Sequence, residues 1–309
     1  MIHPLRIGVL VEGRYLSQAQ PAGMMAALRT RGHEVVAIVV DEAAEQIGVD
    51  TWLEGLDLIV ARGRAWHLLC LLGWAEARRA RTVNRHASIA AVCNKAEMEI
   101  ALATACLPIP RSFIGSIDRV ARQVRDEDYP LILKPIFGDN ARGLRTVKSR
   151  ADIASLEWPE PMVLAQRYVA GAGRDLKLYG IGRQVWAVRK PSPLNGRVGT
   201  SDKVEPVETT PALQDLGRRC ADLFGLELYG VDCIETEDGP VVIEVNDFPN
   251  FTGVPDADNK LAQYLTSIAP RRRSKPSSHR LTSRVASRLG AHRSTSPVRR
   301  TALVRSMRS

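Results

Sequence analysis

Along the first third of the chain, short apolar runs alternate with stretches in which apolar residues recur at helical spacing. The apolar runs predict strands at residues 5–11, 33–40 and 56–61. The helical spacing predicts helices at residues 22–31 and 65–81, and Gly32 follows the first of them, where a helix stop is expected. Strands and helices in this order are typical of a parallel sheet covered by helices. The pattern therefore predicts a small Rossmann-like unit that ends near residue 88.

From residue 94 onward, strands dominate the pattern. Helices are expected at residues 94–105, closed by a proline-containing segment, and at residues 211–224. Apolar runs predict strands at residues 131–134, 162–166, 176–181, 184–189, 229–235 and 241–245. The turns Gly180-Ile181-Gly182 and Asp238-Gly239-Pro240 separate pairs of these strands, which favours antiparallel hairpins. We therefore expect an α+β body that differs in kind from the first third.

The bulk composition is that of a soluble protein with a substantial core. Hydrophobic residues make up 45% of the 309 positions, and this length predicts two or three compact units. No apolar run approaches the ~20 residues that a membrane span needs. Five scattered cysteines, without a CxxC pair, favour a reducing compartment over a zinc site. We expect a cytoplasmic protein with no membrane span.

The positive charge is confined to the C-terminal tail. Of 43 Lys and Arg, 12 lie at residues 271–309, which hold no Asp or Glu, so the 34 acidic residues outnumber the other 31 basic ones by three. The tail is rich in Arg, Ser, Thr and Pro, which predicts disorder. It could bind nucleic acid or another acidic partner through counterion release, although a tail without a dedicated partner is the favoured interpretation. The body offers no basic excess for such binding.

A predicted hairpin brings three oxygen-bearing side chains together. With its turn at Asp238, position 232 lies opposite position 244, and alternation places Glu244 and Asn246 on one face. Asp232, Glu244 and Asn246 then form a patch with no basic residue among them, while Val241, Ile243 and Val245 face the core. Such a patch suits Mg²⁺. The equally open alternative is the solvated face of an exposed hairpin.

Other segments suggest binding less strongly. Lys134 ends an apolar strand before a loop with Gly138 and Gly143, which could cradle a phosphate, although an ordinary turn with a solvated lysine is favoured for the loop alone. Arg62-Gly63-Arg64 could grip a carboxylate at the sheet edge, but a solvated loop is favoured. The apolar stretch at residues 66–74 is better interpreted as core or as the face of a homo-oligomer.

In their order along residues 83–253, these signals resemble the ATP-grasp superfamily, and within it the RimK-like glutamate ligases and LysX-like amino-group ligases. The matching segments are Val83-Asn84-Arg85, Asn94-Lys95, the loop after Lys134, Gln166-Arg167-Tyr168-Val169, and Gly230-Val231-Asp232 followed by Glu244-Val245-Asn246. The resemblance implies a Rossmann-like pre-ATP-grasp domain at residues 1–88. It implies a two-lobed ATP-grasp fold at residues 89–165 and 166–270, with the disordered basic tail at 271–309.

The resemblance also implies the roles of individual residues around Mg-ATP, with one or two Mg²⁺ ions that Mn²⁺ could replace. Lys95 and Lys134 would reach the phosphates beneath the glycine loop of Gly138 and Gly143. Adenine would contact the hinge formed by Gln166, Arg167, Tyr168 and Val169, with main-chain atoms of Tyr168 and Val169 facing the base. Asp175 would take the ribose or another polar site. Lys177 and Lys190 would be catalytic, and the metal ligands would be Asp232, Glu244 and Asn246.

The implied activity is a carboxylate–amine ligase that works through an acyl phosphate, with small substrates such as an amino acid or short peptide. Lys177 and Lys190 stand where RimK-like enzymes tend to have arginines, and Arg167 stands where glutamate is usual. Two alternatives stay open. One is an ATP-grasp kinase acting on a small-molecule hydroxyl, which the acidic body weakly disfavours. The other is a non-catalytic nucleotide-binding protein whose tail binds an acidic partner.

Overall fold

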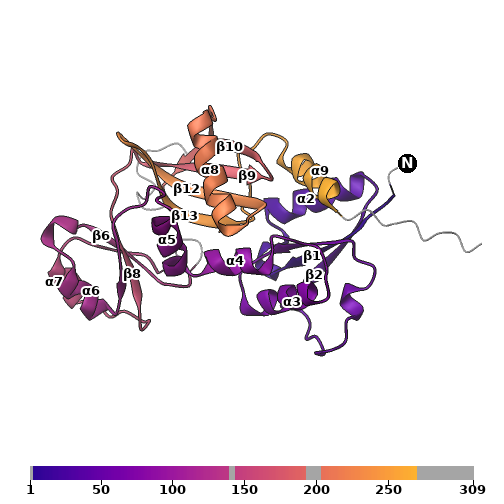
Figure 1. The fold of residues 1–309 in the computed structure, drawn as a ribbon, viewed down its shortest axis with the longest axis horizontal. Helices are drawn as coiled ribbons and strands as arrows, with labels where there is room; N and C mark the ends of the chain where they lie inside the picture. Colours follow the sequence, from indigo (N-terminus) through magenta and orange to yellow (C-terminus); the bar gives the residue numbers. More distant parts are fainter. Residues whose placement is uncertain (1–2, 139–142, 193–202, 270–309) are drawn as a thin grey trace, which may run out of the picture. The chain divides into compact units, whose positions relative to one another are not determined.

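The chain begins with a four-stranded parallel sheet. The computed structural model describes residues 3–138, 143–192 and 203–269, so the predicted basic tail lies outside the described residues. The sheet has the strand order β2-β1-β3-β4, with β1 Arg6–Val11, β2 Glu34–Val39, β3 Leu58–Arg62 and β4 Thr82–Val83. Figure 1 labels β1 and β2 of this sheet. The three predicted strands are confirmed, whereas the short β4 was not predicted.

Helices cover both faces of this sheet because its strand residues alternate between two cores. Ile7 and Val9 pack with Met24 of α2, Ala19–Thr30, while Leu10 packs on the other side with Leu68 of α3, Trp66–Ala77. A short helix, α1 Gly13–Leu16, and a 3₁₀ turn, η1 Thr51–Leu53, lie in the connections. The predicted helix 65–81 ends earlier, at Ala77, because Arg79 adopts a left-handed φ of 64°.

Two helices in tandem follow the parallel sheet. They are α4 His86–Cys93, which was not predicted, and α5 Lys95–Thr104, which matches the predicted helix 94–105. The Asn94 side chain accepts hydrogen bonds from the main-chain N–H groups of Ala96 and Glu97, at 3.0 and 3.1 Å, and so begins α5. This cap fixes the first residue of α5, Lys95, at the helix start.

The second sheet is antiparallel, with strand order β5-β8-β6-β7. Its strands are β5 Ser112–Gly115, β6 Leu131–Lys134, β7 Arg145–Val147 and β8 Val163–Arg167, and its helices are α6 Ile117–Gln123 and α7 Arg150–Ala154, with the 3₁₀ turn η2 Asp126–Asp128. Val120 and Ile153 of the two helices pack on Leu131, Leu133 and Val163 of the strands. The predicted strands 131–134 and 162–166 are confirmed, while the shorter elements were missed.

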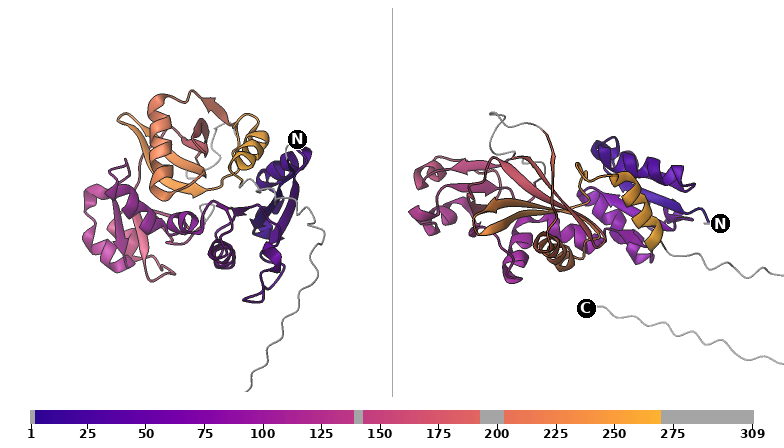
Figure 2. Two further views of the ribbon diagram at one scale, coloured as in Figure 1. Left: turned by 45° about the vertical axis from the view of Figure 1, so that its right-hand side comes forward. Right: turned by 90° about the horizontal axis from the view of Figure 1, so that it is seen from above.

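The third sheet has five antiparallel strands in the order β11-β10-β9-β12-β13. These are β9 Arg174–Ile181, β10 Gln184–Pro191, β11 Glu205–Val207, β12 Leu228–Thr236 and β13 Gly239–Asp247, and α8 Pro211–Phe224 packs on them (Figure 2). Thr210 caps the start of α8 through the N–H of Leu213, and Gly225 ends the helix at φ 66°. Both predicted hairpins and the helix 211–224 are confirmed.

A β-bulge in the last hairpin corrects one prediction. Asp232 pairs with Glu244 as expected, but the next pair is Cys233 with Val242, so Ile243 is an extra residue. Val242 and Val245 are therefore fully buried, and the prediction that Val241 and Ile243 face the core is wrong. The bulge reverses the alternation of side chains at one point of the strand.

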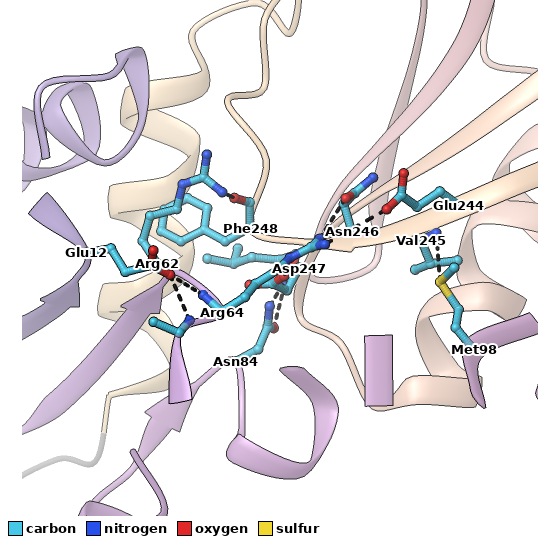
Figure 3. Close-up of polar contacts among 12 residues, drawn as sticks. Glu12, Arg62, Arg64, Asn84, Met98, Glu244, Val245, Asn246, Asp247 and Phe248 are labelled. Carbon is cyan, nitrogen blue, oxygen red and sulfur yellow. Dashed lines mark hydrogen bonds and ion pairs between the residues drawn. The ribbon is translucent and has the colours of Figure 1, made fainter. Parts of the chain in front are cut away.

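The last strand and helix connect back to earlier elements. β13 is an edge strand, and the main-chain N–H of Val245 donates to Met98 Sδ of α5 at 3.3 Å (Figure 3). Helix α9, Ala257–Ile268, lies beside α2 (Figures 1 and 2), where Arg31 donates to Asn259 at 3.2 Å. Arg62, the last residue of β3, donates to the carbonyl of Phe248, which follows β13, so the end of β13 lies next to the carboxyl end of β3. Within the described ranges, no helix has the length and apolar character of a membrane span.

Candidate active site

A cavity of about 490 Å³ gathers the side chains that the sequence singled out. Every predicted site residue lines it except Gly143, whose neighbour Leu144 does: these are Lys95, Lys134, Gly138, Gln166, Arg167, Tyr168, Val169, Asp175, Lys177, Lys190, Asp232, Glu244 and Asn246. The glycine loop can be followed only at its two ends, because residues 139–142 fall outside the described ranges. Of the described residues in its wall, seven are basic and four acidic. The cavity is therefore cationic.

The carboxylates of the predicted metal patch each face a lysine. Glu244 Oε1 forms a short ion pair with Lys95 Nζ, and Asp232 Oδ2 lies 2.9 Å from Lys177 Nζ. Lys177 also contacts Asp175, at 3.2 Å. These cations come from α5 and β9, which are far away in sequence, so the spacing of the hairpin alone did not show that each carboxylate pairs with a lysine.

Arg64 adds a further cation to this patch and also contacts the last residue of β13. Its Nε lies 2.9 Å from Asp247 Oδ1, its Nη2 donates to Asn246 Oδ1 at 2.7 Å, and its Nη1 lies 3.9 Å from Glu244 Oε1 (Figure 3). The Arg64 side chain is only 14% exposed. The favoured interpretation of residues 62–64 as a solvated loop is therefore wrong.

Glu12, at the end of β1, holds the loop that presents Arg64. One of its carboxylate oxygens accepts the main-chain N–H groups of Arg64 and Ala65, the latter at 2.9 Å (Figure 3). The loop can approach this closely because residue 63 is glycine: a Cβ there would lie 2.4 Å from Glu12 Oε1, and its φ of 145° disfavours other residues. The fold thus fixes Arg64 through its backbone as well as its side chain.

Arg62 and several residues that the sequence did not single out close this end of the cavity. Arg62 donates to the Phe248 carbonyl, and its guanidinium lies 4.2 Å from the centroid of the Tyr15 ring. Gln18 accepts from Asn250 Nδ2 at 3.0 Å. These residues come from three segments that meet only in the folded chain. The one usable signal in the sequence was Arg62-Gly63-Arg64 at the carboxyl end of a parallel strand.

The two predicted phosphate lysines are buried, with 7% of each residue exposed. Lys95 begins α5, and its main-chain N–H donates to the Ile136 carbonyl at 3.0 Å. Lys134 ends β6, and its Nζ donates to the carbonyl of the bulge residue Ile243 at 3.3 Å. The solvated-lysine alternative for Lys134 is therefore wrong, and both ammonium groups point into the cavity beside Glu244.

Burial and neighbouring charges shift the pKa values of these groups. Burial by itself raises the pKa of Glu244, but Lys95, Arg64 and Lys134 lower it to about 2, so the carboxylate is ionised at neutral pH. Burial lowers the pKa of Lys134, against the attraction of Glu244. Despite burial, Asp232 and Asp175 raise the pKa of Lys177. Burial and the neighbouring Lys177 lower the pKa of Lys190.

The predicted hinge ends β8. Gln166 is buried, and its Nε2 donates to Glu99 Oε1 at 2.8 Å. The main-chain N–H of Tyr168 donates to the Pro130 carbonyl at 2.9 Å. This N–H is engaged within the protein, so it is no donor for a base, and the predicted contacts of the hinge with adenine rest on its other main-chain atoms.

The metal prediction can be tested against the chemistry of its donors. Asp232 and Glu244 are cross-strand partners in the cavity wall, and Asn246 adds an amide oxygen. Magnesium in proteins is commonly held by one or two carboxylates together with substrate phosphates and water. No cluster of three His, Cys, Asp or Glu suited to a metal occurs in the described part of the chain. The donor set thus fits an ion that shares its coordination with phosphate oxygens.

Comparisons with known proteins point to one family. The model of the RimK-like ATP-grasp domain matches residues 93–266. A tetrahydromethanopterin:alpha-L-glutamate ligase of Methanococcus maripaludis is 27% identical over 159 residues, 48% of this chain and 54% of the relative. A probable alpha-L-glutamate ligase of Maridesulfovibrio salexigens is 24% identical over 86% of this chain and 96% of its own. The chain spans about half the length of the first curated relatives it matches.

Solved structures share the fold. A RimK domain ATP-grasp protein from Sphaerobacter thermophilus superposes with a TM-score of 0.70 at 20% identity, over 85% of this chain and 99% of that one. The ATP-grasp ligase PsnB, in a complex with a minimal precursor variant, Mg and ADP, gives a TM-score of 0.65 at 20% identity, over 84% and 97%.

Proposed function

Because the chain belongs to the RimK-like ATP-grasp family, we propose that it is an ATP-dependent ligase that joins a small carboxylate to an amine. One observation carries the proposal: buried lysines meet the carboxylates of Asp232 and Glu244 in a cationic cavity, and the lowered pKa of Glu244 keeps that carboxylate ionised. Relatives named alpha-L-glutamate ligases support an amino acid or short peptide as substrate.

The proposed reaction needs no protein nucleophile. An oxygen of the substrate carboxylate attacks the γ-phosphorus of ATP, and the bond from that phosphorus to the ADP oxygen breaks. The nitrogen of the amine then attacks the acyl carbon, inorganic phosphate leaves with the bonding electrons, and the nitrogen loses a proton to solvent. The protein contributes positioning and charge compensation. In this proposal, Lys95 and Lys134 offset the charge of the phosphates. Lys177 of β9 and Lys190 of β10 line the same cavity and are the proposed catalytic lysines.

We assign Asp232, Glu244 and Asn246 to one or two Mg²⁺ ions, which Mn²⁺ could replace. Such an ion, when bound, neutralises phosphate charge. In the structure these oxygens contact Lys95, Lys177 and Arg64, so ion binding has to weaken those contacts. With Glu244 holding such an ion, Lys95 would turn its ammonium toward the phosphates.

We place adenine at the hinge Gln166–Val169 and the ribose or another polar group at Asp175. The location of these residues in the wall of the same cavity as the lysines supports this arrangement. Glu99 holds the side chain of Gln166, which supports a rigid hinge.

The setting of the protein remains a matter of proposal. We propose a cytoplasmic protein, which its five unpaired cysteines support. A homo-oligomer stays a prediction without added support, because Leu68, Leu69, Leu71 and Leu72 of the apolar helix pack into the core. Binding of an acidic partner through residues 271–309 likewise stays a prediction.

The test is Mg²⁺-dependent release of ADP and phosphate with a panel of amino acids and small carboxylates, read out with product masses. A product lighter by one water than its two substrates establishes the ligase, whereas a phosphorylated alcohol establishes the kinase instead. Glu244→Gln is expected to abolish turnover without unfolding the protein. Glu237→Gln, an exposed residue at the turn of the same hairpin, is the control and should keep full activity. Normal turnover by Glu244→Gln would remove the assignment of the metal site.

A further inference from the structure

A second cavity, of about 270 Å³, adjoins the reaction cavity. The two share Arg64 and Gly138 in their walls. The remaining wall is mostly apolar: besides Arg14, it is formed by Ala65, Trp66, Leu69, Ala90, Cys93 and Phe137. A group in this cavity therefore lies one side chain away from the carboxylates of β13.

Two aromatic side chains in the wall of this cavity are largely exposed to solvent. Trp66, the first residue of α3, is 72% exposed, and Phe137, which follows β6, is 54% exposed. Their ring centroids lie 6.2 Å apart, although Trp66 belongs to a helix of the parallel sheet and Phe137 follows a strand of the second sheet. The other large apolar residues of this helix, such as Leu68 and Leu72, are buried in the core. Exposed aromatic residues in contact beside an apolar cavity are typical of a binding surface.

We propose that this second cavity is the subsite for an apolar side chain of the substrate, aromatic or branched aliphatic, next to the reacting carboxylate or amine. The inference rests on the proposed ligase function and narrows its substrate class. We call this cavity the apolar subsite. At ~30 Å³ per water it has room for roughly nine waters, which suits one large side chain and not a folded segment.

The charges at the apolar subsite favour this occupant over an acidic side chain. Two arginines reach its wall, and each already pairs with a carboxylate of the protein. Arg14 Nε lies 2.7 Å from Glu12 Oε2, and Arg64 Nε lies 2.9 Å from Asp247 Oδ1. A glutamate side chain would have to compete with these partners and lose its hydration against apolar walls. An apolar side chain meets neither obstacle.

The subsite can be tested by binding alone, without turnover. The full chain is labelled with 5-fluorotryptophan, and the resonance of Trp66 is assigned from its absence in Trp66→Phe. Titration with L-phenylalanine and L-leucine is expected to shift this resonance to saturation, with at least ~10-fold higher affinity than L-glutamate. A shift of the same size and affinity with L-glutamate, or no shift with either apolar amino acid, would overturn the inference.

Variants of the wall locate the effect. Ala90→Leu fills the subsite, and Ala87→Leu adds the same side chain to an exposed position of the same helix, α4. The first should lower the affinity for L-phenylalanine about 10-fold, and the second should leave it unchanged. Phe137→Ala, at an exposed position, serves as the second variant if Ala90→Leu misfolds, and it should lower the affinity similarly.

Unchanged affinity in both wall variants would place the binding elsewhere and overturn the inference. The fluorine titration is separable from the ligase test. Selective binding without ADP release leaves the subsite standing and removes the ligase. ADP release without selectivity for apolar amino acids supports the ligase and removes the apolar subsite.

Discussion

Asn84 offers the sharpest test of how the chain holds its first and third sheets together. Asn84 is fully buried, and its side chain makes three hydrogen bonds to Glu227 and Leu228, which are 143 and 144 positions away in sequence, where β12 begins. Its Nδ2 donates to the Leu228 carbonyl at 2.7 Å, and its Oδ1 accepts from the N–H groups of Glu227 and Leu228 at 2.7 and 3.0 Å. The amide side chain thus pairs with main-chain N–H and C=O groups in the way that a neighbouring strand would.

Replacing Asn84 with alanine leaves the N–H groups of Glu227 and Leu228 without this partner, whereas the Leu228 carbonyl keeps its hydrogen bond from the Phe248 N–H at 3.1 Å. A hydrogen bond contributes about 1 kcal/mol net, and a buried group left unpaired costs about 1–3 kcal/mol. Because Leu228 is itself fully buried, we expect Asn84→Ala to lower the free energy of unfolding by about 3–5 kcal/mol. A domain of this size loses about 2–4 °C per kcal/mol, so the melting temperature should fall by roughly 10 °C.

Urea unfolding, followed by circular dichroism, measures this loss, and Asp222→Asn provides the control. Asp222 accepts two hydrogen bonds from Arg183 Nη1, at 2.9 and 3.0 Å, but the two side chains are 64% and 70% exposed. Such an exposed pair contributes at most about 1 kcal/mol. If Asn84→Ala and Asp222→Asn cost the same, the argument from burial is wrong.

Two further predictions concern acid stability and close packing. The pKa of Glu244 is lowered from 4.5 to about 2, so its ionised form stabilises the fold above pH 4.5, and this stability is lost as the pH falls toward 2. In EDTA, the unfolding free energies of the wild type and of Glu244→Gln should therefore converge as the pH is lowered. Parallel curves of unfolding free energy against pH would contradict the assignment. Gly180→Ala should lower the free energy of unfolding in urea by about 1–3 kcal/mol or more, because a Cβ at this position would lie 1.9 Å from the Tyr229 ring. Gly115→Ala is the control and should cost little, because the nearest neighbour of its Cβ would lie at 3.8 Å. Equal losses in the two variants would refute the steric explanation.

Local signals were strong enough to predict the elements that carry most of the site. Helix α8 has proline at its first position, a threonine cap and a glycine stop, so local chemistry defines both of its ends. The hairpin of β12 and β13 follows from alternation and its turn, which is why the pairing of Asp232 with Glu244 was predicted correctly. Short elements such as β4 lack enough residues to show a period.

The bulge at Ile243 and the partners of the carboxylates could not be predicted in this way. An extra residue in a strand leaves the hydrophobic run continuous, so the sequence gives no sign that the alternation is reversed. Lys95, Lys177 and Arg64 reach β13 from three separate elements, and only the tertiary fold decides which carboxylate each one meets. Resemblance to a family located the lysines but not Arg64.

The charge of the cavity differs from the net charge of the protein, and this difference bears on the choice between ligase and kinase. Residues 1–270 carry a net charge of −3, which by itself disfavours a pocket for a phosphorylated acceptor. Of the described residues that line the reaction cavity, however, seven are basic and four acidic. The acidic excess of the body therefore lies outside the cavity, and a field of several kT can exist in a cleft whatever the net charge of the protein. Net charge consequently does not separate the two reactions. The ligase and the kinase differ in their second substrate, and the apolar wall beside Arg64 is the more informative feature for identifying that substrate. An apolar side chain next to the reacting group suits an amino acid or peptide better than a phosphorylated alcohol.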